Sequence, residues 1–263
     1  MSASYVLMEV VAPSLGFTLA NVMFFSAVPE MLRRKRANDL GEMNPYPFPV
    51  IFANCVAWMA YSCYIDDYFL FFANAPGCMI GLFFTLVAYG LSEHGSRARD
   101  ALERIAMALL VAMMALLFFV GIPGANLDVD VKRQVVGAFC NAVLLAYYAA
   151  PLSVMKRVIA TRDSSSLHAP LAAANTVNGA AWFTYGMALG DWFLAAPNAI
   201  GAALGIIQLV LLRAYPRRKA LEGTLGGVLP TAAGYVTPSL SAADLLAMQD
   251  GAPLGSAAPV SSA

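Results

Sequence analysis

Runs of apolar residues alternate with short polar segments along most of this chain. A helix needs about 20 mostly apolar residues to cross a bilayer, and a series of these runs reaches that length. The first run lacks the basic segment and cleavage site of a signal peptide, so we expect it to be retained. The pattern predicts an all-α membrane protein with seven transmembrane helices, at residues 6–29, 46–65, 68–91, 105–122, 134–155, 170–189 and 192–213.

The composition also favours a membrane protein over a soluble one. Hydrophobic residues make up 60% of the 263 positions and charged residues 12%, whereas a soluble domain carries about 25% charged residues. The sixteen basic residues equal the sixteen acidic ones, so no net positive field exists to bind nucleic acid. The cysteines all lie inside predicted spans, where cysteine packs as a small hydrophobe, and they imply no disulfide framework: Cys55, Cys63, Cys78 and Cys140.

The distribution of Lys and Arg predicts the orientation, because basic residues in short loops stay on the cytoplasmic side. Fourteen of the sixteen follow spans one, three, five and seven, and we place most of them in loops: Arg33–Arg36, Arg97, Arg99, Arg104, Lys156, Arg157 and Arg162. The other side has only Lys132 and Arg133. We therefore expect the N-terminus outside and the C-terminus in the cytoplasm, with a disordered tail from about residue 220.

An internal repeat relates the two halves of the chain. The segment Asp67–Gly77 in span three matches Asp191–Gly201 in span seven, 124 residues later. Pro29 in span one matches Pro151 in span five at a separation of 122. The separation of 124 also relates three residues of span two to three of span six: Asn54, Trp58 and Tyr61 to Asn178, Trp182 and Tyr185.

Each repeat has three helices, so the second would enter the membrane upside down unless another helix intervened. Span four supplies that helix and makes the repeats parallel, related by an axis along the membrane normal. We assign residues 1–92 to the first repeat, 93–124 to the linker helix, 125–215 to the second repeat and 216–263 to the tail.

This 3+1+3 plan and several stretches of sequence resemble the SWEET family of sugar transporters over about residues 6–215. The stretches are Tyr148–Lys156, Asn178–Gly186 and Pro197–Gly201, followed by Gly205–Leu209. The resemblance implies a facilitative uniporter, not an enzyme, that moves a neutral mono- or disaccharide down its gradient. It implies alternating access, in which one site is exposed to each side of the lipid bilayer in turn.

Asn74 and Asn198 are the first candidates for substrate-binding residues. An unpaired amide in an apolar run costs a few kcal/mol, so each needs a partner. An interhelical hydrogen bond is the ordinary use of such a residue. Parallel repeats, however, bring equivalent residues to face each other across the pseudo-axis, where an amide suits a neutral polyol. The resemblance supports this second interpretation.

Trp58 and Trp182 are similar to the family's pair that stacks on the sugar ring, although packing or interfacial anchoring is the common use of Trp in membranes. Asn54 and Asn178 lie one turn earlier on the same helical faces, so they should border the same cavity.

Phe25 and Tyr147 lie four residues before the repeat prolines, as Asn54 and Asn178 lie four before the tryptophans. All four are larger than the Val and Ser side chains that we associate with disaccharide carriers of the family. A narrower cavity follows, so we expect a hexose such as glucose to be preferred over sucrose.

Four prolines towards the cytoplasmic ends of the spans look like the family's tetrad at the inner gate and hinge: Pro29, Pro47, Pro151 and Pro170. A static kink or a helix terminus is the alternative. The pattern is imperfect, because Pro45 and Pro49 compete with Pro47, and a separation of 124 from Pro47 reaches Leu171.

Two tyrosines end spans two and six, and two aspartates open spans three and seven, on the outer side: Tyr61, Tyr185, Asp67 and Asp191. A phenol and a carboxylate can form a charge-assisted hydrogen bond and release it when the bundle rocks. The resemblance suggests that these residues form the outer gate. Interfacial aromatics beside solvated acids remain the alternative.

Other functions fit less well. Related amino-acid or cystine carriers share the plan but carry a Pro-Gln pair, where this chain has Pro29-Glu30 and Pro151-Leu152. A seven-helix receptor has no reason for a three-helix repeat. An enzyme would need grouped catalytic residues or metal ligands at membrane depth, and we find no such group, no metal site and no cofactor motif.

The residues of the predicted spans also favour transport of the substrate down its concentration gradient. Apart from Glu9, the interiors of the predicted spans hold no titratable group that could carry a coupled proton, and no phosphate-binding loop occurs. We expect a plasma-membrane location, with an intracellular membrane as the alternative, and leave homo-oligomerisation open.

Overall fold

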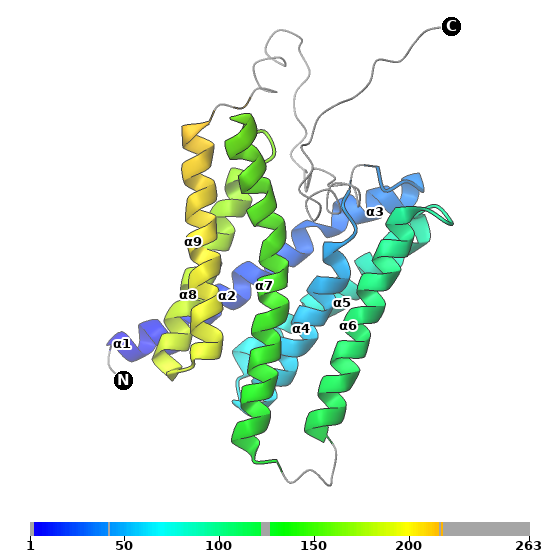
Figure 1. Cartoon of the computed structure of the whole chain (residues 1–263). Helices are drawn as coiled ribbons and strands as arrows, with labels where there is room; N and C mark the ends of the chain where they lie inside the picture. The colour runs from blue at the N-terminus through cyan, green and yellow to red at the C-terminus, as the bar shows by residue number, and fades with distance from the viewer. Residues whose placement is uncertain (1–2, 42, 122–126, 216, 218–263) are drawn as a thin grey trace, which may run out of the picture.

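The computed structural model describes residues 3–41, 43–121, 127–215 and 217. Within these residues the secondary structure is entirely helical (Figure 1). The elements are α1 (Ala3–Tyr5), the π-helix η1 (Val6–Val11), α2 (Ala12–Ser26), α3 (Val28–Ala37), α4 (Pro47–Tyr64), α5 (Tyr68–Leu91), α6 (Arg97–Gly121), α7 (Val129–Thr161), α8 (Ala169–Leu189) and α9 (Trp192–Ala214). Because α1 to α3 follow one another directly, the helices form seven segments, as predicted.

Five helical segments in the described part of the chain are long and apolar enough to span a membrane: Val6–Ala37, Tyr68–Leu91, Arg97–Gly121, Val129–Thr161 and Trp192–Ala214. The helices α4 and α8, predicted as spans two and six, are not in this set. They lie between other helices, α4 against α5, α6 and α7, and α8 against α9, α2 and η1. A helix that faces protein on several sides needs less apolar surface than one that faces lipid.

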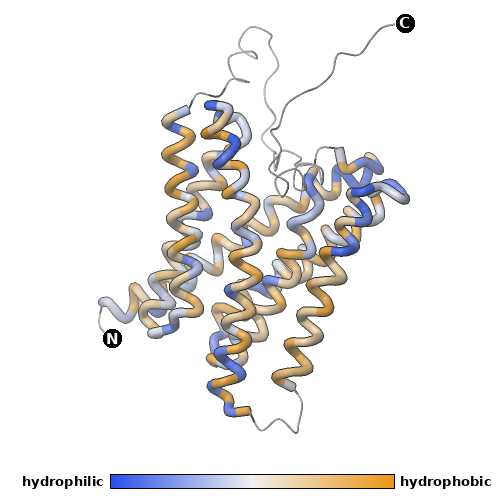
Figure 2. Tube along the Cα trace, in the orientation of Figure 1, coloured by the Kyte–Doolittle hydropathy of each residue, from blue (hydrophilic) through white to orange (hydrophobic). Residues whose placement is uncertain are grey.

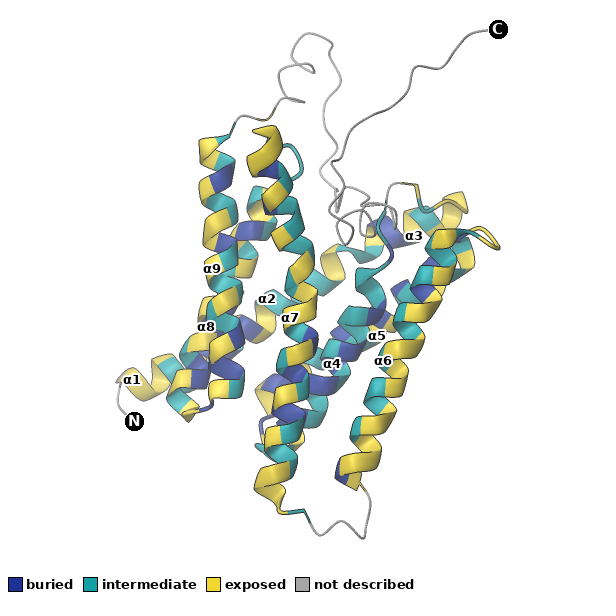
Figure 3. Ribbon diagram, in the orientation of Figure 1, coloured by how far each residue is buried: buried dark blue, intermediate teal, exposed yellow. Residues whose placement is uncertain are grey.

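The helix α6, by contrast, is exposed along most of its length (Figure 3). Only Leu102 and Val120 of this helix are buried. Its exposed residues are large and apolar, including Met107, Val111, Met114 and Phe118. Such a surface suits contact with lipid tails. Figure 2 shows the same hydrophobic colouring along α5 and α9, with hydrophilic residues gathered on α3 and at the start of α6.

Several helices extend beyond the predicted spans, and this corrects the placement of the basic residues. Arg33–Arg36 lie in α3, Arg97, Arg99 and Arg104 lie in α6, and Lys156 and Arg157 lie in α7, so these residues are helical and not in loops. Only Arg162, the residue after α7, adopts a non-helical conformation. Hydropathy marks where a helix leaves the bilayer. The helical backbone hydrogen bonds extend beyond that point through Arg and Lys residues, because these are good helix formers. Of the predicted tail, residues 216–263, all but residue 217 lie outside the described residues.

The two repeats differ at their prolines. The first helical segment breaks at Ala27, between α2 and α3, and Pro29 lies in the first turn of α3, where its missing N–H removes no helical bond. The equivalent segment of the second repeat, α7, continues through Pro151 without a break. The first repeat therefore has a one-residue interruption at Ala27, whose carbonyl still accepts from the N–H of Met31, where the second has one continuous helix.

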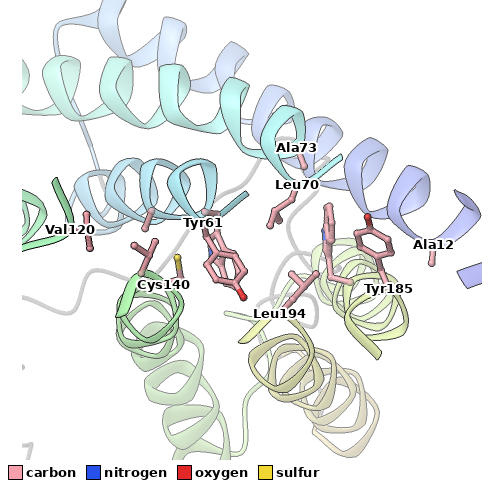
Figure 4. Close-up of a cluster of buried hydrophobic side chains, with 12 residues drawn as sticks. Ala12, Tyr61, Leu70, Ala73, Val120, Cys140, Tyr185 and Leu194 are labelled. Atoms are coloured by element: carbon pink, nitrogen blue, oxygen red, sulfur yellow. The ribbon is translucent and has the colours of Figure 1, made fainter. Parts of the chain in front are cut away.

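Buried residues form one cluster shared by the two repeats and two clusters that belong to one repeat each. The shared cluster lies where α4 and α8 end and α5 and α9 begin, which we call the Tyr61 end. Figure 4 shows side chains of both repeats gathered there, among them Ala12, Tyr61, Leu70 and Ala73 with Cys140, Tyr185 and Leu194. The cluster also contains Trp58, Val136 and Trp182.

The opposite end, where α4 and α8 begin, is called the Pro47 end. One cluster there is centred on Met31, Phe84 and Val87 of the first repeat, and another on Met155, Val158, Leu167 and Leu211 of the second. Within the described residues, neither cluster includes a member from the other repeat. Figure 1 shows α4–α6 and α7–α9 diverging towards this end. The repeats are thus packed together at the Tyr61 end and have separate cores at the Pro47 end.

Candidate functional site

A hydrogen bond joins the two repeats at the Tyr61 end. The hydroxyl of Tyr61 in α4 donates to Oδ2 of Asp191, the residue before α9, at 2.7 Å. Both residues are buried, Tyr61 completely. The other carboxylate oxygen of Asp191 accepts from the backbone N–H of Leu194 at 3.1 Å and so caps α9. One carboxylate therefore starts a helix of the second repeat and holds a helix of the first.

Arg133 at the start of α7 completes this contact. Its Nη2 donates to Asp191 Oδ2 at 3.1 Å, and its Nε approaches the Tyr61 hydroxyl at 3.4 Å. The buried carboxylate is therefore neutralised as well as hydrogen-bonded. Sequence reasoning used Arg133 only as evidence of orientation, because nothing in the local pattern places an arginine against a residue 58 positions away.

The repeat-equivalent residues, Asp67 and Tyr185, lie close together but are not joined in the same way. Asp67 Oδ1 accepts from the N–H of Leu70 at 3.0 Å and caps α5, as Asp191 caps α9. Its carboxylate interacts electrostatically with Tyr185. Among the described residues, however, Asp67 Oδ2 has no hydrogen-bond partner, although the side chain is only 7% exposed. The structure thus contains the predicted motif twice, with a 2.7 Å hydrogen bond in the Tyr61–Asp191 copy and a looser contact in the Tyr185–Asp67 copy.

The tryptophans form the layer beneath these pairs. Trp58 packs edge-on against Tyr61, with ring centroids 5.8 Å apart, and Trp182 packs against Tyr185 at 6.1 Å. A Cβ atom on Gly16 of α2 would lie 2.8 Å from the Trp182 ring, so this glycine lets the indole approach the backbone. The indoles are 4% and 5% exposed. In this conformation they fill the interior, so stacking on a sugar would require neighbouring side chains to move.

Asn74 and Asn198 adopt the same arrangement in the two repeats. Each is half-buried, and each Nδ2 donates to the backbone carbonyl four residues earlier, Leu70 or Leu194, at 2.8 Å. This bond uses one amide hydrogen, so each side chain keeps a second donor and its acceptor oxygen for another partner. The local bond also fixes the orientation of the amide.

Asn54 and Asn178 provide the clearest sign of an unfilled polar site. The Oδ1 atom of each is buried, and among the described residues neither has a hydrogen-bond partner. A buried polar atom without a partner costs about 1–3 kcal/mol, so native proteins rarely leave one unpaired. The same atom is unpaired at equivalent positions of both repeats.

Phe25 and Tyr147 are both exposed, by 56% and 38% of their surfaces. Their neighbours make the tight contacts instead. A Cβ atom on Gly77 would lie 2.5 Å from Phe24, and one on Gly201 would overlap the hydroxyl of Tyr148, which donates to the Pro197 carbonyl at 2.9 Å. The role of Phe25 and Tyr147 at the site therefore stays a prediction.

The four candidate prolines share one property, which is that none is buried. Pro47 and Pro170 lie in the first turns of α4 and α8, and Pro29 and Pro170 are exposed. Pro45 and Pro49, which compete with Pro47 in the sequence, are both buried. Of Pro45, Pro47 and Pro49, Pro47 is thus the one whose surface stays accessible. Around these prolines the repeats have separate cores, so nothing at the Pro47 end corresponds to the shared cluster.

A family profile described as "Sugar efflux transporter for intercellular exchange" matches residues 13–93 and 134–220. This chain belongs to the SWEET family. Its two matched segments each contain one copy of the tyrosine, tryptophan, asparagine and aspartate set. SWEET proteins are transporters and not enzymes, so the site described above has no catalytic role. Within the described residues no group of three or more His, Cys, Asp and Glu could hold a metal ion.

Similar proteins include "Sugar transporter SWEET1" of Drosophila pseudoobscura pseudoobscura, 28% identical over 190 residues, covering 72% of this chain and 82% of the relative. "Bidirectional sugar transporter SWEET2a" of Sorghum bicolor is 30% identical over 212 residues, covering 79% and 84%. A solved eukaryotic SWEET transporter has a similar fold, with a TM-score of 0.67 over 80% of this chain and 97% of that one at 24% identity. The all-α, seven-helix membrane fold is therefore that of a SWEET protein.

Proposed function

We propose that this SWEET protein carries a neutral sugar, a hexose such as glucose, down its concentration gradient by alternating access. The observation that supports this most directly is the pair of unpaired amide oxygens on Asn54 and Asn178. A sugar hydroxyl is a neutral donor that would satisfy both. Trp58 and Trp182, one turn along the same helices, would supply the apolar faces on which a sugar ring stacks. Asn74 and Asn198 would add the remaining hydrogen bonds.

The packing of the repeats supports an assignment of conformation. The shared cluster and the Tyr61–Asp191 bond close the Tyr61 end, while the Pro47 end has two separate cores. With the basic residues on the cytoplasmic side, the Tyr61 end faces out and the described state is open towards the cytoplasm. The plasma membrane is the proposed location. Pro29, Pro47, Pro151 and Pro170 would then close the inner side when the bundle rocks.

The charges within the membrane segments support uniport. Glu30, buried in α3, is already paired with Arg33 and with Arg34, whose Nε lies 2.7 Å from Glu30 Oε1. Asp191 is neutralised by Arg133. Glu30 and Asp191 are therefore held in ion pairs and are poorly placed to pick up and release a proton in each cycle. The third buried acid among the described residues, Asp67, caps α5 through the N–H of Leu70. The energy would come from the sugar gradient itself.

Counterflow in proteoliposomes tests the function. Vesicles that contain purified protein and a high concentration of unlabelled glucose should take up labelled glucose from outside above its external concentration for a short time. Protein-free vesicles and vesicles loaded with cystine serve as controls. Absence of counterflow for glucose and for sucrose, from protein shown to be folded and inserted, would refute sugar transport. Counterflow with sucrose as fast as with glucose would refute only the hexose preference.

A further inference from the structure

Asn141 of α7 is a polar residue outside the set of sugar-binding residues proposed above. Its side chain is half-buried, and its Oδ1 atom is buried without a hydrogen-bond partner among the described residues. The buried amide oxygens of Asn21, Asn54 and Asn178 share this property. The amide of Asn21, however, is held by its own helix, because its Nδ2 donates to the Phe17 carbonyl at 2.9 Å. Native proteins rarely leave a buried amide oxygen unpaired, so Asn141 Oδ1 is available to accept a hydrogen bond.

The neighbours of Asn141 on α7 show which helices this side chain faces. The helix α7 packs against both α4 and α9 (Figure 1). Gly137 lies one turn before Asn141, and a Cβ atom on it would be 2.9 Å from the Tyr61 ring and 2.7 Å from the Phe193 ring. Tyr148 lies two turns after Asn141, and its hydroxyl donates to a backbone carbonyl of α9 at 2.9 Å. Residues four and seven apart share one face of a helix, so Asn141 also faces α4 and α9.

The depth of Asn141 in the bundle follows from the same contacts. A helix rises about 1.5 Å per residue, so Asn141 lies about 6 Å along α7 beyond the contact with the two rings. An equal step along α9 ends beside Asn198, and an equal step along α4, which runs the opposite way, ends beside Trp58. Cys140, the residue before Asn141, is a buried member of the same cluster as Trp58. Asn141 is therefore at the depth of the proposed sugar site.

Asn141 differs from the other candidates because the first repeat has no polar counterpart of it. Phe24 of α2 and Tyr148 of α7 contact repeat-equivalent glycines and are 124 residues apart. The same separation relates Asn141 to Phe17, whose side chain has no hydrogen-bonding group. The paired asparagines and tryptophans occur once in each repeat, whereas this amide comes from the second repeat alone.

A site built only from equivalent pairs presents the same groups to a ligand in two orientations that differ by a half-turn. A sugar lacks this symmetry, so the pairs alone would bind it in both orientations with similar free energies. We propose that Asn141 is a further sugar-binding residue, which hydrogen-bonds one hydroxyl of the sugar and so selects one of the two orientations. This inference rests on the proposed function, because it adds a specificity-determining residue to the same site.

Deoxyglucoses that each lack one hydroxyl test this role, as competitors of labelled glucose in proteoliposome counterflow. In wild type, the analogue that lacks the hydroxyl bound by Asn141 should compete about tenfold less well than glucose, because it leaves a buried amide unpaired. In Asn141→Ala, glucose should compete about tenfold less well than in wild type, and this analogue should equal glucose. Asn175→Ala, the same change at an exposed position of α8, is the matched control and should keep the wild-type ranking of the sugars.

The ratio of each analogue to glucose decides the proposal. A purely structural role of Asn141 would weaken all the sugars alike, so unchanged ratios in Asn141→Ala would overturn the proposal. If this variant inserts but does not transport, the ratios come from the rise in melting temperature that each sugar produces, relative to the rise with L-glucose at the same concentration. Asn141→Leu, which has a similar volume and no amide, replaces a variant that fails to insert.

The wild-type protein separates the two levels of the hypothesis. Absence of glucose counterflow in folded, inserted wild type would refute the proposed function and this role of Asn141 with it. Normal glucose counterflow in wild type, together with unchanged ratios in the Asn141 variants, would overturn only the role of Asn141 and leave the proposed function intact.

Discussion

At the scale of single residues, the site combines hydrogen-bonding groups from two equivalent positions. The paired asparagines are polar side chains in an otherwise apolar interior, and their unsatisfied atoms are what a neutral ligand would satisfy. Asn54 and Asn178 have the unpaired oxygens, whereas Asn74 and Asn198 each spend one amide hydrogen on their own helix. These differences make the contribution of each pair separately measurable.

Replacing Asn74 or Asn198 by alanine should reduce glucose uptake about tenfold or more, because each change removes hydrogen bonds of about 1 kcal/mol or more from a desolvated site. Uptake of labelled glucose by proteoliposomes with matched amounts of inserted protein measures the effect. Asn175→Ala, at an exposed position of α8, is the control and should transport normally. Near-normal uptake by both site variants would remove these asparagines from the site.

Substrate size provides a second prediction at this scale. The double variant Phe25→Val, Tyr147→Val should gain sucrose uptake relative to glucose uptake, because two large side chains that precede the repeat prolines are shortened. Paired uptake of the two labelled sugars gives the ratio for wild type and variant. Phe17→Val, another exposed aromatic of α2, serves as the control. A functional double variant with the wild-type ratio would show that these positions do not filter by size.

At the scale of helices, glycines set how closely the elements of each repeat approach. A Cβ atom on Gly81 of α5 would lie 2.8 Å from the backbone nitrogen of Phe52 in α4. A Cβ atom on Gly179 of α8 would lie 2.8 Å from the backbone nitrogen of Ala202 in α9. Backbone atoms cannot move aside as a flexible side chain can. Close packing through small residues is a general way of associating membrane helices, and here it positions α4 and α8 within their repeats.

Gly81→Ala should therefore destabilise the protein by about 1–3 kcal/mol through overpacking between α4 and α5. Gly90→Ala, on the same helix α5, is the matched control, because an added Cβ there meets nothing within 4 Å. Removing a helical glycine at this open position should be neutral or stabilising. The melting temperature of each variant in detergent is measured by heating the protein and monitoring the loss of the folded peak by size-exclusion chromatography. Equal melting temperatures for the two variants would contradict the close approach.

At the scale of the whole molecule, the two repeats act as bodies that share one core and separate at the other end. The shared cluster contains the tyrosines and tryptophans of both repeats, so opening the Tyr61 end must pull these rings apart. The first segment is interrupted at Ala27 and carries Pro29 in the first turn of α3, whereas α7 continues through Pro151. We therefore expect the two repeats to contribute unequally to the rocking motion.

For the whole molecule we predict that no ion is transported together with the sugar. Glucose uptake into proteoliposomes should equilibrate with the external concentration and should not exceed it when a pH gradient is imposed, because two of the three buried acids in the described residues, Glu30 and Asp191, are held in ion pairs. An uncoupler should leave uptake unchanged. Accumulation above equilibrium that the uncoupler abolishes would show proton coupling and contradict uniport.

The sequence alone determined the fold class and the set of paired positions. Apolar runs of spanning length predict helices because the bilayer forces the backbone to satisfy its own hydrogen bonds. The separation of 124 residues predicts which tyrosines, tryptophans, asparagines and aspartates are equivalent, because repeated helices place repeated residues at equal depth. Helix ends were predicted less well, since hydropathy reports the membrane boundary and not the end of the hydrogen-bonded helix.

The tertiary structure decided which of the equivalent residues meet. It joins Tyr61 to Asp191 at 2.7 Å with Arg133 beside them, whereas Asp67 Oδ1 caps α5 through Leu70, although the sequence presents the two pairs alike. It brings in Arg133 from another helix and shows that Phe24, and not Phe25, contacts Gly77. Local patterns specify the face and depth of a side chain on its own helix. Contacts between helices depend on their separation, their crossing and the break at Ala27, which are set by packing over the whole molecule.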